Sequence, residues 1–146
     1  MKTKILLSLF VVVILAACRK DKFNTIPTLT LKSVSDKTVS PGGSLKVVFE
    51  ITDKEGDISN TLFYKKVRTN SRPVTPQDDL GRDSLTYPIP EAPNTRSILM
   101  DINLGYPLLQ STLRREPDSL TLQFWIEDKA ANKSEIFSIE NVVILK

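Results

Sequence analysis

Apolar and polar residues alternate with a period of two along most of the chain after Pro27. The alternation is clearest at Leu45–Ile51 and Leu120–Ile126, where every second residue is apolar. This pattern is typical of β-strands with one buried face, as in antiparallel sheets. Strands are expected at residues 28–34, 45–51, 61–67, 84–88, 96–104, 119–127 and 134–145.

Turn-forming residues separate these strands. Ser40-Pro41-Gly42-Gly43 predicts a tight turn, and Asp128–Asn132 predicts a second, in which Asn132 takes the left-handed conformation. Residues 70–94 hold five of the nine prolines, which favours loop and edge strand there because proline cannot donate to a β-ladder. A single helical turn is predicted at Thr75–Asp78, where proline follows an N-cap residue.

Two further stretches are less regular. Residues 108–116 are compatible with a short helix or a packed loop, because Leu109 and Leu113 are four residues apart. In the last strand the apolar phase shifts near Glu140-Asn141, which predicts an irregularity there.

Six or seven strands in about 120 residues with little helix indicate an all-β domain. We expect an antiparallel β-sandwich over residues 27–146, and a closed barrel is the alternative. Residues 18–26 are short, mostly polar and without periodicity, which is typical of a tether.

The first 17 residues have the composition of an export signal. Lys2 and Lys4 precede Ile5–Ala17, thirteen residues of which only Ser8 is polar. A membrane-spanning helix needs roughly 20 apolar residues, so this run is predicted to be a signal peptide instead. An ordinary secretory signal, with Cys18 as a chance thiol, is the simpler alternative.

Leu15-Ala16-Ala17-Cys18 follows the apolar run directly and closely resembles the lipobox of bacterial lipoproteins. The resemblance implies cleavage before Cys18, a thioether from its sulfur to diacylglycerol, and acylation of the new α-amine. Burial of acyl chains contributes about 0.8 kcal/mol per methylene, so a triacylated Cys18 would be a stable membrane anchor. Cys18 is the only cysteine, which excludes a disulfide within one chain.

The residues after Cys18 refine the expected location. Arg19 stands where an inner-membrane retention signal of the enterobacterial kind would have aspartate. Lys20-Asp21-Lys22 has one acidic residue and matches poorly the acidic tag that directs related lipoproteins to the outer surface. The prediction is an outer-membrane lipoprotein that faces the periplasm.

Composition narrows the possible functions. Removal of residues 1–17 leaves 129 residues with 18 basic and 17 acidic side chains, interspersed along the chain, which gives no electrostatic case for a nucleic-acid partner. The chain has no histidine, which removes the commonest general base and zinc ligand. With the one cysteine assigned to a lipid, thiol catalysis and Cys/His metal sites are also lost, and a non-catalytic protein is expected.

Two turns resemble those of immunoglobulin-like domains in bacterial envelope proteins. Phe49–Ile58 is similar to their strand followed by an Asp-x-x-Gly-Asp-Ile turn, and Phe124–Ser134 is similar to their last hairpin. Ala131 stands where that hairpin usually has glycine. With the lipobox, the chain resembles small immunoglobulin-like lipoproteins of the Bacteroidota type. The resemblance implies the fold of residues 27–146 and hardly constrains the function.

Acidic residues cluster in the two turns that such a sandwich would bring to one end. Asp53, Glu55 and Asp57 would lie near Glu127 and Asp128, and calcium prefers six to eight oxygen ligands from loops of this kind. We therefore consider a calcium site at Asp53, Glu55, Asp57 and Asp128. The simpler interpretation is that these residues are solvated and form good turns.

Basic and aromatic residues give two further candidate surfaces. Lys65, Lys66 and Arg68, with Arg114 and Arg115, could form a basic face for anionic glycans or lipid headgroups, or merely a solvated strand face. Trp125 is predicted to point outward beside Phe63 or Tyr64, where it could contact a sugar or a partner. Alternatively, Trp125 packs beneath residues 70–94.

The sequence therefore predicts a lipid-anchored cell-envelope protein that acts as a non-catalytic binding or structural module. Its expected partners are the membrane, through Cys18, and an envelope protein or glycan. The alternative is a calcium-stabilised adhesion or glycan-binding domain.

Overall fold

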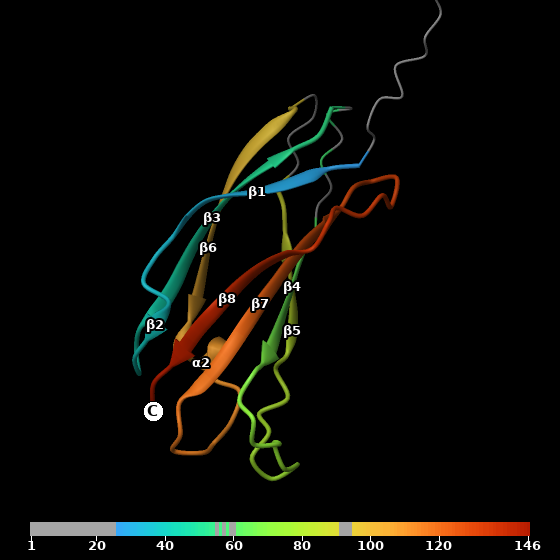
Figure 1. Ribbon diagram of the computed structural model, residues 1–146. Coiled ribbons are helices and arrows are strands. Elements are labelled where there is room, and N and C mark those ends of the chain that lie inside the picture. Colours follow the sequence, from blue (N-terminus) through green and yellow to red (C-terminus); the bar gives the residue numbers. More distant parts are fainter. Residues whose placement is uncertain (1–25, 55, 57, 59–60, 91–94) are drawn as a thin grey trace, which may run out of the picture.

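A computed structural model describes residues 26–54, 56, 58, 61–90 and 95–146 of the chain. The domain is an all-β sandwich of two sheets, with one short helix (Figure 1). The strands are β1 (Thr28–Val34), β2 (Thr38–Val39), β3 (Ser44–Thr52), β4 (Thr61–Arg68), β5 (Ser84–Pro88), β6 (Ser97–Gly105), β7 (Asp118–Glu127) and β8 (Phe137–Ile144), and the helix is α2 (Tyr106–Leu109). The expected sandwich is confirmed, and the barrel is excluded.

One sheet has the order β1-β3-β6, and the other has the order β2-β8-β7-β4-β5. The first, second and fifth long strands (β1, β3 and β6) lie in one sheet, whereas the third, sixth and seventh (β4, β7 and β8) lie in the other. This distribution is that of an immunoglobulin-like sandwich. One pairing departs from the expected antiparallel arrangement. β2, a two-residue strand that the alternation did not indicate, lies parallel to the end of β8, with Thr38 opposite Val143 and Val39 opposite Ile144.

Alternation along each long strand builds the core between the sheets. In β3 and β7 every second side chain is buried, as the period-two pattern requires. Phe49 of β3 meets Phe124 of β7 with ring centroids 5.0 Å apart, and Phe137 of β8 lies 5.6 Å from Phe49. These tilted and edge-on contacts link the two sheets at the centre of the sandwich.

Three local expectations can be compared with the structure. The predicted irregularity near Glu140-Asn141 is confirmed, since the register between β7 and β8 shifts there and Asn141 has a φ of 60°. Residues 108–116 hold only the end of the one-turn helix α2, and Thr75–Asp78 forms a turn rather than a helix. In the β7–β8 turn, Ala131 takes the positive φ (64°), so the assignment of that conformation to Asn132 is wrong.

The sequence signals at the N-terminus concern residues outside the described part of the chain. These are the signal peptide (residues 1–17), the lipobox and Cys18, and most of the tether. Within the described residues, no helix has the length and apolar character needed to cross a bilayer.

Candidate functional site

The predicted calcium site is only partly within the described residues. Glu55 and Asp57 lie outside them, whereas Asp53 and Asp128 are both buried. The two acidic turns do lie at the same end of the sandwich, because Thr61 at the start of β4 pairs with Glu127 at the end of β7 (Figure 1). Over the described ranges, however, no group of three or more acidic, cysteine or histidine residues is placed to hold a metal ion.

The Asp128 carboxylate is used within its own turn. Its Oδ1 accepts a hydrogen bond from the Asn132 backbone N–H at 2.7 Å, and its Oδ2 accepts one from Asn132 Nδ2 at 2.6 Å. The Ala131 N–H donates to the Asp128 carbonyl at 3.0 Å. In this arrangement the acidic side chain accepts a backbone N–H across the turn, where a backbone carbonyl would otherwise be the acceptor. Both oxygens of Asp128 therefore stabilise the hairpin connection.

Trp125 lies on the outer face of the five-stranded sheet beside Phe63, its partner in the β4–β7 register. The two rings are parallel within 3°, with centroids 5.3 Å apart, and Lys133 Nζ lies 4.6 Å from the centroid of the Trp125 ring. Stacking and cation–π contacts of this kind each stabilise exposed aromatic rings by about 0.5–1.5 kcal/mol. An aromatic ring and an ammonium group thus already contact Trp125, and a sugar would have to compete with both.

Tyr64, the other predicted neighbour of Trp125, points to the opposite face of the sheet. Its side chain is fully buried, and its ring centroid lies 5.4 Å from that of Phe124 in the core. Burial raises the pKa of the Tyr64 phenol, since the charged form is poorly solvated there.

The predicted basic face does not form as expected. Lys65 is exposed on the outer face of β4, but Lys66 is only 2% exposed and belongs to the interior. Lys66 Nζ donates to the carbonyl oxygens of Leu108 and Gln110 at 3.0 and 2.8 Å. Desolvation lowers the pKa of Lys66, and nearby carboxylates only partly offset this effect. The assignment of Lys66 to a partner surface is therefore wrong.

Two of the expected surface arginines are also engaged in ion pairs. Arg68 Nε lies 3.1 Å from Asp118 Oδ1, and its Nη2 lies 2.8 Å from Glu116 Oε1. Arg114 Nε lies 2.8 Å from Asp78 Oδ2, and the side chains of both arginines are only 9% exposed. Arg68, Arg114 and Lys66, three of the five residues of the predicted basic face, therefore bind other groups of the domain.

Asp118, at the start of β7, is the centre of a buried polar cluster that was not predicted from the sequence. Besides the ion pair with Arg68, its Oδ2 lies 2.6 Å from Lys146 Nζ and accepts the backbone N–H groups of Ser111 and Thr112. Its Oδ1 accepts the Thr112 hydroxyl at 2.9 Å. Burial alone would raise the pKa of Asp118, but hydrogen bonds from Lys146, Ser111, Thr112 and Arg68 outweigh it and lower the pKa.

One signal for this cluster was present in the alternation. Asp118 is in phase with the buried Leu120, Leu122 and Phe124, just as Lys66 is in phase with Leu62 and Tyr64. A charged residue at an inward position of a strand indicates a buried, compensated charge. Through Ser111 and Thr112 on one side and Arg68 on the other, Asp118 connects the segment after α2 to the sheets.

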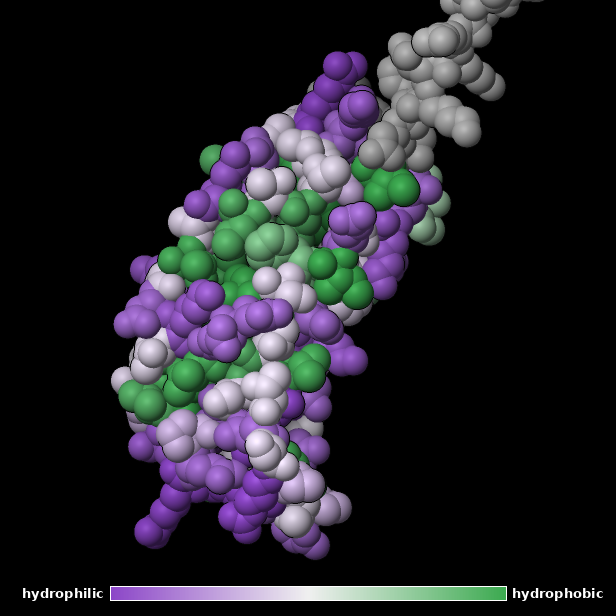
Figure 2. Space-filling view, viewed as in Figure 1, coloured by the Kyte–Doolittle hydropathy of each residue, from purple (hydrophilic) through white to green (hydrophobic). Residues whose placement is uncertain are grey.

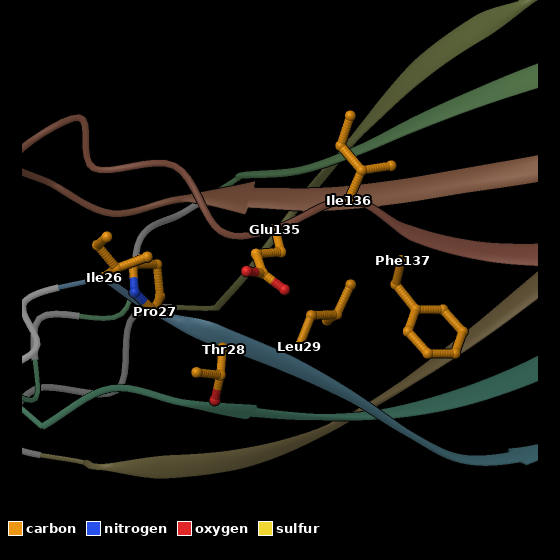
Figure 3. Close-up of a pocket in the computed structure, with 7 residues that line it drawn as sticks. All are labelled: Ile26, Pro27, Thr28, Leu29, Glu135, Ile136 and Phe137. Carbon is orange, nitrogen blue, oxygen red and sulfur yellow. The ribbon is translucent and has the colours of Figure 1, made fainter.

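An open groove runs along one side of the sandwich, between β1 and the first half of β8. It consists of two adjoining hollows of about 380 and 290 Å³, which share Phe137. Figure 3 shows the first hollow, where the side chains of Leu29 and Phe137 extend into the space between β1 and β8 and the Glu135 carboxylate lies over β1. Leu31, Val34 and Ile139 line the second hollow. We call these two hollows together the β1–β8 groove.

Comparison with known proteins adds no assignment to this geometry. No model of a known protein family matches the chain, and no curated protein matches it.

Proposed function

We propose that the protein is a lipid-anchored component of the bacterial cell envelope that acts as a non-catalytic binding or structural module. The observation that carries the proposal is Leu15-Ala16-Ala17-Cys18, placed directly after a run of signal-peptide length. Lipidation at Cys18 would leave the eight residues 19–26 as a tether between the membrane and the sandwich.

The chemistry available to the chain supports the non-catalytic role. The chain contains no histidine, and its single cysteine belongs to the lipobox. The most elaborate polar cluster of the described residues, around Asp118, uses its hydrogen bonds internally. The carboxylates of Glu135 and Glu140 that line the β1–β8 groove are exposed, which suits recognition of a partner better than acid–base chemistry in an enclosed cleft.

Lipidation can be tested with the full chain expressed in a bacterial host that is fed an alkyne-tagged fatty acid. We expect wild-type protein to carry the label and to fractionate with membranes. Cys18→Ser should lose both properties, whereas the adjacent Arg19→Ser should keep them, since position 19 lies outside the lipobox. Absence of label from wild type, or persistence of label in Cys18→Ser, would refute the anchor.

The orientation is a separate part of the proposal. An outer-membrane protein that faces the periplasm should resist protease added to intact cells and become sensitive once the outer membrane is permeabilised. Rapid loss of the domain from intact cells would place it on the outer surface instead.

The calcium alternative finds no metal-binding group among the described residues, and the glycan alternative rests on a hollow of about 600 Å³ lined by Phe63 and Trp125. Asp128 is satisfied within its turn, and Trp125 is already contacted by Phe63 and Lys133. Thermal unfolding with and without millimolar calcium tests the metal directly. A calcium-dependent rise in Tm that is lost in Asp53→Ala would revive this alternative.

A further inference from the structure

One edge of the five-stranded sheet is only partly covered. β2 pairs with β8 at Val143 and Ile144 and extends no further. Between Phe137 and Asn141, β8 has β7 on one side and, within the described part of the chain, no paired strand on the other. An edge of this kind presents backbone donors and acceptors that can pair with another strand.

The direction of these backbone groups follows from the hydrogen bonds of β7. The Ile126 carbonyl accepts the Ser134 N–H, so Ile126 faces the β8 side, and alternation places Phe124 and Leu122 on the same side. Their partners in β8 are Phe137 and Ile139.

Ser138 and Glu140 consequently direct their N–H and C=O groups away from β7, toward the groove. The Glu140 carbonyl accepts Lys37 Nζ at 3.2 Å, which agrees with this direction. Within the described part of the chain, no paired strand uses the Ser138 N–H, the Ser138 C=O or the Glu140 N–H, so another strand can bond to them.

The groove beside this edge has an apolar floor. Leu29, Leu31 and Val34 of β1 face Phe137 and Ile139 of β8 across it, and all five pack against or belong to the core. Figure 2 shows apolar side chains gathered on this face of the molecule between hydrophilic rims. Ile26 is 46% exposed at the end of the groove where the described chain begins. Side chains on alternate positions of an added strand would be buried against this floor.

The charge at the groove is acidic at both ends of the free edge. Glu135 lines the first hollow and Glu140 lines the second, and both are exposed. Among the ion pairs of the described residues, none includes either carboxylate. Lys37 is the one basic residue among those that line the two hollows, and it is directed to the Glu140 carbonyl. This charge distribution favours an occupant with basic residues.

We infer that the β1–β8 groove binds an extended segment of a partner protein, which adds as a strand to the free edge of β8 in line with β2. The segment has apolar side chains at alternate positions and at least one Lys or Arg to pair with Glu135 or Glu140. Five residues of β8 offer about 17 Å of edge, enough for a peptide of similar length. The inference deepens the binding role proposed above and rests on it only for the location of the partner.

The test uses the full chain in detergent micelles and a phage-displayed library of random dodecapeptides. Enriched peptides are synthesised, and their affinities are measured by fluorescence anisotropy. We expect alternating apolar residues with Lys or Arg in the enriched set. Hydrogen exchange should show protection at the Ser138 and Glu140 amides when the peptide is bound.

Two matched pairs of variants identify the surface. Ser138→Pro removes a donor that faces the groove and should weaken binding about tenfold, whereas Ser138→Ala keeps the donor and should bind as wild type does. Glu135→Lys should weaken binding of basic peptides about threefold. Asp101→Lys, the same charge change on an exposed residue of β6 in the other sheet, should leave binding unchanged.

Several outcomes would overturn the inference. They are absence of enrichment, protection elsewhere on the domain, or equal affinities of Ser138→Pro and Ser138→Ala. Protection at Ser138 that grows with protein concentration in the absence of peptide would show that a second copy of the chain occupies the groove, and would also overturn it. None of these results bears on lipidation of Cys18, so failure of the groove and failure of the anchor are distinguishable.

Discussion

The Asp118 cluster and the β1–β8 groove differ in how their charged and backbone polar groups are satisfied. At Asp118, a fully buried carboxylate receives donors from Arg68, Lys146, Ser111 and Thr112. At the groove, the backbone groups of Ser138 face an open hollow, and the carboxylate of Glu135 is exposed.

This difference indicates which of the two regions has polar groups available to a partner. Buried polar groups are costly unless they are satisfied, and both oxygens of the Asp118 carboxylate already accept hydrogen bonds within the domain, which stabilises one arrangement. An exposed strand edge costs little in water and can exchange its solvent hydrogen bonds for those of another strand. Charge density alone does not identify an exposed surface here, because the largest concentration of ionic contacts among the described residues is internal.

The largest expected effect comes from loss of the carboxylate at the centre of the cluster. Asp118→Ala would leave the buried Arg68 and Lys146 without a compensating charge and should lower the free energy of unfolding by about 3–5 kcal/mol. Urea unfolding measures the change. Asp101→Ala, which removes an exposed carboxylate on β6, is the matched control and should change stability by less than about 0.5 kcal/mol. A similar small change for Asp118→Ala would contradict the structural role of the cluster.

A pair of proline substitutions compares the two strands directly. Gln123 lies in the central strand β7 opposite Lys65, and its N–H belongs to the ladder with β4, so Gln123→Pro should cost about 3 kcal/mol or more. Ser138→Pro removes an N–H that faces the groove, and edge positions tolerate proline, so its cost should be below about 1 kcal/mol. Thermal unfolding of both variants checks the difference. Equal losses would show that the β8 edge is paired in the folded protein.

The pH dependence of stability provides a third comparison. The pKa of Asp118 in the folded state is lowered below its ordinary value of 3.8, so the folded state holds fewer protons than the unfolded state in this range. The stabilisation is therefore fully present above about pH 4 and is lost as the pH falls below 3.8 toward the folded pKa. Urea unfolding between pH 6 and pH 3 measures the slope. Asp118→Asn should flatten it, whereas a neutral substitution at the exposed Asp101 should not.

The alternation of apolar residues was sufficient to predict the sandwich and its seven long strands, because burial of one face is the main requirement of such a strand. It could not reveal β2, since two residues are too short to show a period. The alternation did place Lys66 and Asp118 in the inward phase of their strands. That signal competes with the average exposure of charged residues, which is why their burial was not predicted.

The candidate site was less predictable than the fold. The β1–β8 groove depends on where β1 leaves the first sheet and β2 joins the second, which no local pattern specifies. The sequence pointed instead to acidic turns and outward aromatics, and the structure shows that Asp128 and Trp125 have partners within the domain. Turn chemistry decided the case of Asp128, and the β7–β8 turn shows how.

The smallest expected effect concerns that turn, where the groove-forming half of β8 begins. Asp128 accepts the Asn132 N–H through its side chain, and this geometry places the positive φ on Ala131, one residue before the asparagine expected to take it. An L-residue other than glycine pays a steric cost in the left-handed region, so Ala131→Gly should stabilise the domain by about 0.5–1 kcal/mol. Ala130→Gly, at the neighbouring position without a positive φ, should be neutral or slightly destabilising. Differential scanning calorimetry resolves the two variants. A gain at position 130 with none at 131 would show that the turn adopts another conformation, in which Asp128 is released from Asn132 and a carboxylate becomes accessible at that end of the sandwich.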